Sequence, residues 1–256
     1  MTLNDIYHAI GPVALSLGPL QIRWYGLAYV AGFICAFLVI AKLSQRWKIR
    51  INDDAFFTVV FCVIFGVILG GRLGYVLVYG DGYYLPHPEK ILASNEGGMS
   101  FHGGLVGVII GGVIAAKITK IPFLTLADMG VVGVPIGLFF GRCANFINGE
   151  LWGAPTDMPW GVVFGGAAGT MPRHPSQLYE ALLEGVVLFI ILFALSRKTP
   201  ARPRGTFFGT FLLFYGLFRF TIEFIRQPDA QIGYLLGTHW FTMGQALSIP
   251  LMVAGV

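Results

Sequence analysis

Charged side chains are scarce in this sequence. Only 12% of its 256 residues are Asp, Glu, Lys or Arg, whereas 55% are hydrophobic. An ordinary globular domain carries about 25% charged residues. A soluble fold could not bury this much apolar surface. The composition therefore predicts an all-α protein that crosses a membrane several times.

Cysteine is also rare, and its three copies form no pairing pattern. Cys35, Cys62 and Cys143 all lie in apolar stretches, and their odd number and irregular spacing give no disulfide framework. We interpret them as small core residues. A nucleophilic Cys143 is the weaker alternative, because no histidine is close to it in sequence.

Several motifs that define other classes of protein are missing. The chain has no H-E-x-x-H or C-x-x-C pattern and neither type of glycine-rich phosphate loop. Its basic residues flank apolar stretches instead of forming one patch. We therefore expect no metal, no cofactor and no nucleic-acid partner. A cleavable signal peptide is not expected either, because the first basic residue is Arg23.

Apolar stretches of spanning length predict seven transmembrane helices within a single integral membrane domain, residues 1–256. They lie near 22–41, 55–79, 102–118, 124–147, 176–196, 205–226 and 239–256. The last stretch ends with the chain, so we expect the natural protein to extend further.

The positions of the basic residues predict the orientation. The links after the first, third and fifth spans hold more than half of the 17 Lys and Arg residues, namely Lys42, Arg46, Lys48, Arg50, Lys117, Lys120, Arg197, Lys198, Arg202 and Arg204. Basic loops stay in the cytoplasm. The N-terminus is then outside, the C-terminus is inside, and loops 80–101, 148–175 and 227–238 form a small periplasmic head. Residues 1–20 are interpreted as a short interfacial segment.

Glycines recur four residues apart in three of the predicted spans. They are Gly66, Gly70, Gly74; Gly103, Gly107, Gly111; and Gly133, Gly137, Gly141. Small residues at this spacing let membrane helices approach closely. We interpret the three sets as ridges for helix packing.

Four arginines fall inside or at the edge of predicted spans. We interpret Arg23 as extending its guanidinium to the membrane–water interface, which is a structural role. For Arg72, this structural role and a functional role carry equal weight. Arg142 and Arg219 are harder to explain, since a charge at bilayer depth costs about 2.5–3.5 kcal/mol on insertion scales. Two such charges predict a shared polar cavity. An Arg–Glu pair within a helix is the simpler alternative.

Polar residues at helical spacing surround these arginines. Asn145 and Gly149 lie on the same helix face as Arg142, while Tyr215 and Glu223 flank Arg219 on its face. In the fifth span, Glu180 and Glu184 are one turn apart and could meet an arginine or a polar cavity.

Two histidines stand at the edges of spans. His102 is followed by two glycines, which allow a substrate to come close, and an imidazole with its usual pKa near 6.5 suits a base at neutral pH. We expect a catalytic role for it. His174 precedes Pro175 and Ser176, which indicate a helix start, and we favour a structural role.

The segment Gly141–Gly153 resembles the signature G-R-x-x-N-F-x-N-G-E-x-x-G of the bacterial prolipoprotein diacylglyceryl transferases at every fixed position. Further similar stretches are Tyr25-Gly26, His102-Gly103-Gly104-Leu105, His174–Glu180 and the segment around Tyr215, Arg219 and Glu223. The resemblance covers nearly the whole chain in order.

The resemblance implies an inner-membrane enzyme with its site towards the periplasm. Its substrates are phosphatidylglycerol and the lipobox cysteine of a prolipoprotein, and its reaction forms a thioether and releases glycerol 1-phosphate. We expect it to act as a monomer in the lipid bilayer.

The same resemblance, combined with the chemistry of the reaction, assigns the site residues. The catalytic set is His102, Arg142, Arg219, Glu150 and Tyr215. Phosphatidylglycerol binding falls to Arg142, Asn145, Asn148, Tyr25, Gly103, Gly104, Gly153, Glu223 and Arg72. His102 activates the thiol, Arg142 and Arg219 hold the phosphate, and Glu150 and Glu223 orient the arginines or hold glycerol hydroxyls.

Two other functions fit a polar site inside a membrane. A transporter or flippase for an anionic solute or lipid would also keep intramembrane Arg and Glu. However, the sequence shows no internal repeat, and an odd number of spans argues against two equal halves. A different lipid-modifying transferase would keep the site and change the acceptor.

Overall fold

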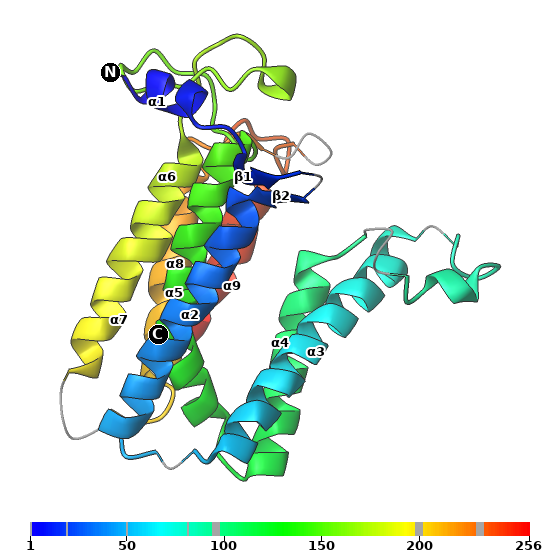
Figure 1. The fold of residues 1–256 in the computed structure, drawn as a ribbon, viewed down its shortest axis with the longest axis vertical. Helices are drawn as coiled ribbons and strands as arrows, with labels where there is room; N and C mark the ends of the chain where they lie inside the picture. The colour runs from blue at the N-terminus through cyan, green and yellow to red at the C-terminus, as the bar shows by residue number, and fades with distance from the viewer. Residues whose placement is uncertain are drawn as a thin grey trace. The chain divides into compact units, whose positions relative to one another are not determined.

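The computed structural model describes residues 2–18, 20–49, 51–80, 82–93, 98–197, 202–228 and 233–256. Of Leu20, Tyr79, Phe101 and His102 it describes the backbone only. The ribbon is mostly helical (Figure 1). Its elements are α1 Leu3–Ala9, β1 Val13–Leu17, β2 Leu20–Arg23, α2 Trp24–Arg46, α3 Asp53–Tyr79, η1 Pro88–Lys90, α4 Phe101–Thr119, α5 Phe123–Asn148, η3 Gly166–Ala168, α6 Ser176–Glu180, η4 Ala181–Val187, α7 Leu188–Ser196, α8 Thr206–Ile222 and α9 Met243–Gly255.

Each of the seven predicted spans contains a helix with similar bounds. Four helical segments are long and apolar enough to cross a membrane: Trp24–Arg46, Asp53–Val78, Phe123–Asn148 and Ser176–Ser196. Three shorter apolar helices are Gly103–Thr119, Thr206–Ile222 and Met243–Gly255. The prediction is confirmed as far as a mostly helical protein with several helices able to span a membrane, but the strands β1 and β2 depart from an all-α fold. The count of seven crossings stays a prediction.

The N-terminal segment holds structure that the sequence analysis did not anticipate. Helix α1 begins with a reciprocal capping box between Thr2 and Asp5. The strands β1 and β2 then pair antiparallel, with Leu15 opposite Ile22. This short hairpin leads directly into α2.

The chain divides into two compact units. Unit 1 contains Met1–Trp47 and Asp128–Val256, and unit 2 contains Lys48–Ala127. The expectation of one integral domain covering residues 1–256 stays a prediction.

Unit 2 is a pair of helices, α3 and α4, that meet along their glycines. A Cβ placed on Gly70 would overlap the carbonyl of Gly103, and one on Gly107 would overlap the carbonyl of Gly66. Gly74 and Gly111 face the partner helix in the same way. The packing ridges predicted for these two helices are confirmed, because only glycine permits such close backbone contact.

Gly107→Ala is expected to destabilise unit 2 by about 1–3 kcal/mol, because the added methyl meets backbone atoms that cannot rotate away. Gly104→Ala is the matched control in the same helix, since its nearest neighbour would be the Val67 carbonyl at 3.7 Å. Thermal unfolding in detergent, followed by circular dichroism, measures both variants. Equal midpoints for the two would contradict the packing account.

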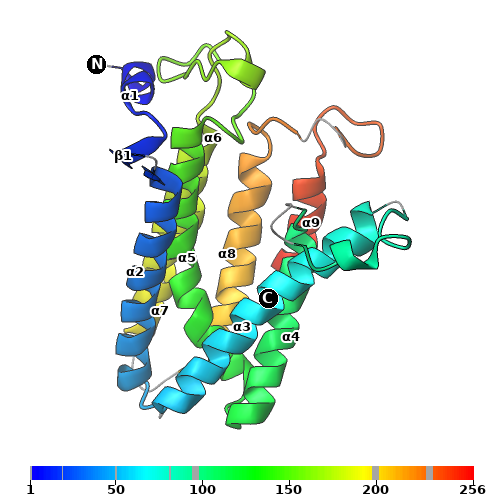
Figure 2. The same ribbon diagram turned by 45° about the vertical axis from the view of Figure 1, so that its right-hand side comes forward.

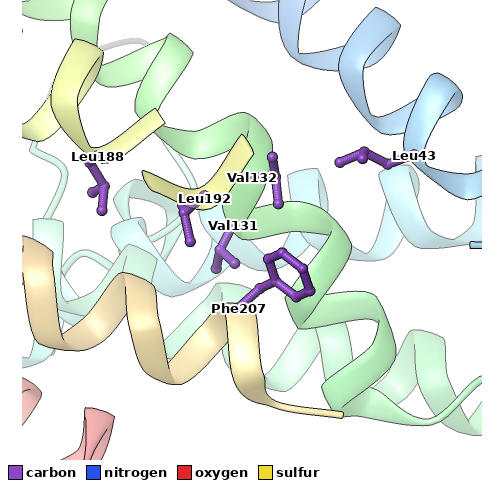
Figure 3. Close-up of a cluster of buried hydrophobic side chains, with 6 residues drawn as sticks. All are labelled: Leu43, Val131, Val132, Leu188, Leu192 and Phe207. Atoms are coloured by element: carbon purple, nitrogen blue, oxygen red, sulfur yellow. The ribbon is translucent and has the colours of Figure 1, made fainter. Parts of the chain in front are cut away.

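Unit 1 is a bundle in which α2, α5, α7 and α8 run side by side (Figures 1 and 2). One apolar core cluster joins these helices: Leu43, Val131, Val132, Leu188, Leu192 and Phe207 (Figure 3). Gly133 of α5 packs against Ala36 and Ile40 of α2, as the glycine spacing predicts. A Cβ on Gly141 would meet nothing within 4 Å among the described residues, so packing at this glycine stays a prediction.

A buried aspartate joins two helices of this bundle. Asp128 of α5 accepts hydrogen bonds from the backbone N–H groups of Gly205, at 2.7 Å, and Phe208, at 2.8 Å. These N–H groups lie at the start of α8, where a helix has no internal acceptors. Asp128 therefore caps α8 from a neighbouring helix.

The predicted fifth span is a continuous helical segment with an unusual centre. Residues Ala181–Val187 form a π-helix between α6 and α7. Within it, a Cβ on Gly185 would lie 2.7 Å from the Cβ of Phe139. The glycine lets this segment approach α5 closely, next to the charged residues described below.

Candidate active site

The signature segment Gly141–Gly153 is the end of α5 followed by a tight turn. Gly149 and Leu151 have positive φ angles of 67° and 59°, on either side of Glu150. A positive φ is unusual for leucine and needs support from neighbouring groups. Asn145 Nδ2 donates to Glu150 Oε1 at 2.7 Å, and Asn148 Nδ2 reaches the same oxygen at 3.4 Å.

This turn is covered by the N-terminal helix. The ring of Tyr7 in α1 packs edge-on against Phe146 and Phe164, at centroid distances of 5.4 and 5.0 Å. Asn4 accepts a hydrogen bond from the Val163 backbone at 2.9 Å. Both views show α1 beside the loop that follows the signature (Figures 1 and 2). The first residues of the chain therefore help to shape the site.

Arg142 lies between two buried glutamates. Its Nε is 3.0 Å from Glu180 Oε2, and its Nη2 is 3.5 Å from Glu184 Oε2. Both glutamates are fully buried, and the Arg142 side chain is 16% exposed. The possibility that Glu180 and Glu184 meet an arginine is confirmed.

Arg219 extends the same network from α8. Its Nη1 ion-pairs with Glu180, and its Nη2 is 2.6 Å from Glu223 Oε1. Arg226 Nη1 lies 3.2 Å from the same Glu223 oxygen. The internal Arg219–Glu223 pair exists, but Glu180 links it to α5, so a pair confined to one helix is too simple an account.

The other oxygen of Glu223 faces the start of α9. Thr242 Oγ1 donates to Glu223 Oε2 at 2.5 Å. A Cβ on Gly244 would lie 2.6 Å from Glu223 Oε1 and 2.7 Å from Oε2, so only glycine leaves room for this carboxylate. Negative charge is favoured at a helix N-terminus.

We call this group of ion-paired side chains the Arg–Glu cluster. Its members are Arg142, Arg219, Arg226, Glu180, Glu184 and Glu223. Three positive and three negative side chains balance when all are ionised. Buried charges persist when they are paired, because an isolated ion in a low-dielectric interior is very costly. The pairing explains how α5, α6, η4, α8 and the residues just after α8 can carry six charged groups among apolar neighbours.

The two tyrosines predicted for the site lie near this cluster. The Tyr25 hydroxyl is within electrostatic range of Glu150 and Arg142, and it contacts the Tyr29 hydroxyl at 3.3 Å. The Tyr215 hydroxyl is within range of Glu184 and Arg219. Unit 1 thus gathers nine of the predicted site residues in one region: Tyr25, Arg142, Asn145, Asn148, Glu150, Gly153, Tyr215, Arg219 and Glu223.

The remaining predicted site residues, Arg72, His102, Gly103 and Gly104, belong to unit 2. Gly103 packs against Gly70 of α3. The His102 side chain lies outside the described part of the structure, and its backbone is in the first turn of α4. Their approach to the Arg–Glu cluster stays a prediction.

Arg72 holds the loop that follows α3. Its guanidinium donates to the carbonyls of Ile91 at 2.8 Å, Lys90 at 2.6 Å and Gly98 at 3.1 Å. The residue is only 3% exposed. These contacts assign Arg72 a structural task, and phosphatidylglycerol binding by Arg72 stays a prediction.

Sequence reasoning left several residues out of the site. Arg226 follows Arg219 by seven positions and Glu223 by three, so helical spacing alone could have identified it. Gln177 precedes Glu180 by three and is equally recognisable. Thr242 and Gly244 come from a distant segment, and no local signal connects them with Glu223.

Gly153 closes the loop after the signature where three segments cross. Its N–H donates to the His174 carbonyl at 2.9 Å, and it pairs with Arg226 in an isolated bridge. A Cβ there would lie 2.6 Å from His174 Cβ and 2.7 Å from the carbonyls of His174 and Ile225. Gly153 therefore shapes this loop, while its part in phosphatidylglycerol binding stays a prediction.

Gly153→Ala is expected to lower stability by about 1–3 kcal/mol, because its methyl meets two carbonyls that take part in backbone contacts. Gly11→Ala serves as the control, since a Cβ on Gly11 would meet nothing within 4 Å. Thermal unfolding of the two variants, measured in parallel, checks the difference. A Gly153→Ala midpoint equal to that of Gly11→Ala would show that the crossing tolerates a side chain.

His174 has the structural role that the sequence favoured. Its Nδ1 is 3.3 Å from the Tyr179 hydroxyl, which accepts a hydrogen bond from Trp160 Nε1 at 2.7 Å. Because the indole is only a donor, the Tyr179 hydroxyl is left to donate to His174. Burial lowers the pKa of His174, which favours the neutral form of the ring.

Together, the apolar helices and the Arg–Glu cluster define a class: a multi-pass membrane protein with a buried cluster of Arg–Glu ion pairs between its helices. A family model described as prolipoprotein diacylglyceryl transferase matches residues 12–256. The chain belongs to this family, and it is a transferase.

Similar proteins span nearly the same length. The phosphatidylglycerol–prolipoprotein diacylglyceryl transferase of Geobacter sulfurreducens is 54% identical over 247 residues, which are 96% of this chain and 93% of the relative. The enzyme of the same name from Nitratidesulfovibrio vulgaris is 49% identical over 96% of this chain and 92% of its own. That of Cupriavidus metallidurans is 50% identical over 98% and 92%.

Proposed function

We propose that this chain transfers the diacylglyceryl group of phosphatidylglycerol to the lipobox cysteine of a prolipoprotein, the first step of lipoprotein maturation. The thiolate attacks the terminal glycerol carbon of the diacylglyceryl group, and the bond from that carbon to the phosphate oxygen breaks. A thioether forms, and glycerol 1-phosphate leaves with the oxygen. The thiol proton goes to a base.

The observation that carries this proposal is the meeting of Arg142 and Arg219, from different helices, at one carboxylate of Glu180. Two guanidinium groups held in fixed positions suit a phosphate that gains charge as its ester bond breaks. Arginine fits phosphate oxygens through a planar fork of N–H donors. Both side chains remain partly exposed, at 16% and 15%, and so are within reach of a ligand.

The other residues take supporting roles. His102 is the base for the thiol, since a base near neutral pKa raises the thiolate fraction. Glu150, held by Asn145 and Asn148, faces the glycerol hydroxyls. Tyr25 and Tyr215 complete the hydrogen bonds to the headgroup. Glu223 orients Arg219.

The topology follows from the charge pattern. Seven spans put the N-terminus and the ends of α5 and α8 towards the periplasm, with the basic links in the cytoplasm. Loops 80–101, 148–175 and 227–238 then form the head over the site. The protein works as a monomer in the inner membrane, and lipid enters from the bilayer.

Purified protein, phosphatidylglycerol vesicles and a lipobox peptide test the function. The peptide is expected to gain the mass of a diacylglyceryl group while glycerol phosphate appears in equal amount. A peptide with Cys→Ser should remain unmodified, because the hydroxyl does not ionise near neutral pH. No modification of the cysteine peptide, or equal modification of the serine peptide, would refute the proposal.

A further inference from the structure

Helix α6 carries an unusual set of buried polar side chains. Ser176, Gln177 and Glu180 are all 0% exposed, although the helix spans only Ser176–Glu180. Burying polar groups is unfavourable unless each finds a partner. The partners of these three residues therefore indicate what the helix does.

The partners of Ser176, Gln177 and Glu180 all belong to the candidate site. Ser176 Oγ donates to the Leu151 carbonyl at 3.0 Å, and Gln177 Nε2 donates to the Glu150 carbonyl at 2.6 Å. These two bonds hold the strained turn that presents Glu150. Glu180, one turn further on, contacts the arginines. Helix α6 thus holds both the turn around Glu150 and the two arginines of the site.

Glu180 is the contact that Arg142 and Arg219 share. Its Oε2 lies 3.0 Å from Arg142 Nε, and its Oε1 pairs with Arg219 Nη1. Two guanidinium groups this close repel each other, and the repulsion is strong where water is excluded. A carboxylate between them offsets the repulsion and fixes their separation.

We propose that Glu180 is a positioning residue of the transferase, holding the guanidinium groups of Arg142 and Arg219 at the spacing that grips the phosphate. This inference rests on the proposed function. Glu180 does not touch the reacting atoms; it acts through the two arginines. The carboxylate is the only one of the described cluster that binds arginines of both α5 and α8.

The other carboxylates of the cluster make this role separable from folding. Without the Glu180 charge, Arg142 keeps Glu184 at 3.5 Å, and Arg219 keeps Glu223 at 2.6 Å. Arg142 and Arg219 each keep one carboxylate partner, but the two arginines are no longer tied to each other. Loss of Glu180 should therefore change catalysis more than assembly.

Glu180→Gln, which keeps the shape and removes the charge, is expected to lower kcat about 100-fold, with a smaller change in KM. Glu89→Gln is the matched control, because Glu89 is exposed and pairs only with His87 among the described contacts; it should retain wild-type kcat. Release of glycerol phosphate measures both. Wild-type kcat for Glu180→Gln would overturn the proposal.

A double-mutant cycle separates positioning from general stability. In an Arg142→Lys background, the bidentate grip is already lost, so Glu180→Gln should cost only a few-fold more. A structural role would give the same fold-loss in both backgrounds, with a matching fall in the thermal midpoint. Multiplicative losses would therefore overturn the proposal.

If Glu180→Gln yields no folded protein, Glu180→Asp takes its place. Aspartate keeps the charge, but it is one methylene shorter and cannot reach both arginines. We expect about a 10-fold loss of kcat, and full activity would overturn the proposal. An inactive wild-type enzyme would instead refute the function itself, so the two failures are distinguishable.

Discussion

Replacing Arg142 with lysine is expected to lower kcat/KM for the lipobox peptide by about 10²–10³-fold, the usual cost of removing one preorganised donor at a developing charge. Lysine keeps the positive charge but presents a single ammonium instead of a planar fork. In this protein, the Arg142 guanidinium also spans Glu180 and Glu184. A lysine could not keep both contacts and face a phosphate as well.

The control for this variant is Arg23→Lys, because Arg23 is exposed at the start of α2. Initial rates of glycerol phosphate release, at several phosphatidylglycerol concentrations, give kcat and KM separately. We expect the control to match the wild type. Full activity in Arg142→Lys would show that charge alone suffices and would remove the bidentate argument.

Replacing His102 with glutamine is expected to lower the rate at neutral pH by about 10²–10⁴-fold, the usual contribution of a general base. The deficit should be largest well below the thiol pKa of about 8.5 and shrink as the acceptor cysteine ionises by itself. The wild-type rate should fall only below about pH 6.5, where an ordinary imidazole becomes protonated.

A pH–rate profile of both proteins checks this prediction. His87→Gln is the control from the same unit, since His87 is half exposed in a loop and faces Glu89. We expect its profile to follow that of the wild type. A His102→Gln profile of near wild-type shape would remove His102 as the base.

Much of the fold could be predicted because its signals are local. The length of the apolar stretches predicts the helices, and the four-residue spacing of glycines predicts the glycine ridges of α3 and α4. Both signals depend on residues that are neighbours within one helix. Gly141 shows the limit of this reasoning. It continues the spacing of Gly133, yet a Cβ on it would meet nothing within 4 Å among the described residues.

The candidate site was predictable only in part. The signature identified Arg142, and helical spacing connected Tyr215, Arg219 and Glu223. The bridge through Glu180 could not be derived, because which arginine a buried glutamate meets depends on how helices far apart in sequence pack. The Asp128 cap on α8 and the Gly244 contact with Glu223 are hidden for the same reason.

Under the proposed function, the Arg–Glu cluster would allow lipid chemistry to occur among apolar helices. The ion pairs with Glu180, Glu184 and Glu223 hold the guanidinium groups of Arg142 and Arg219 in fixed positions. Reorganising them during the reaction is then unnecessary, which is the advantage of a preorganised site. The same arrangement accounts for the glycine at Gly244, where a Cβ would overlap the Glu223 carboxylate.

The most direct test of the central claim is to find which bond of the phospholipid breaks. Phosphatidylglycerol carrying ¹⁸O in the bridge between the diacylglyceryl carbon and phosphorus is incubated with the protein and a lipobox peptide. Mass spectrometry of the products locates the label. We predict ¹⁸O in the released glycerol phosphate and none in the thioether peptide. Label retained on the diacylglyceryl product would contradict a phosphate leaving group held by Arg142 and Arg219.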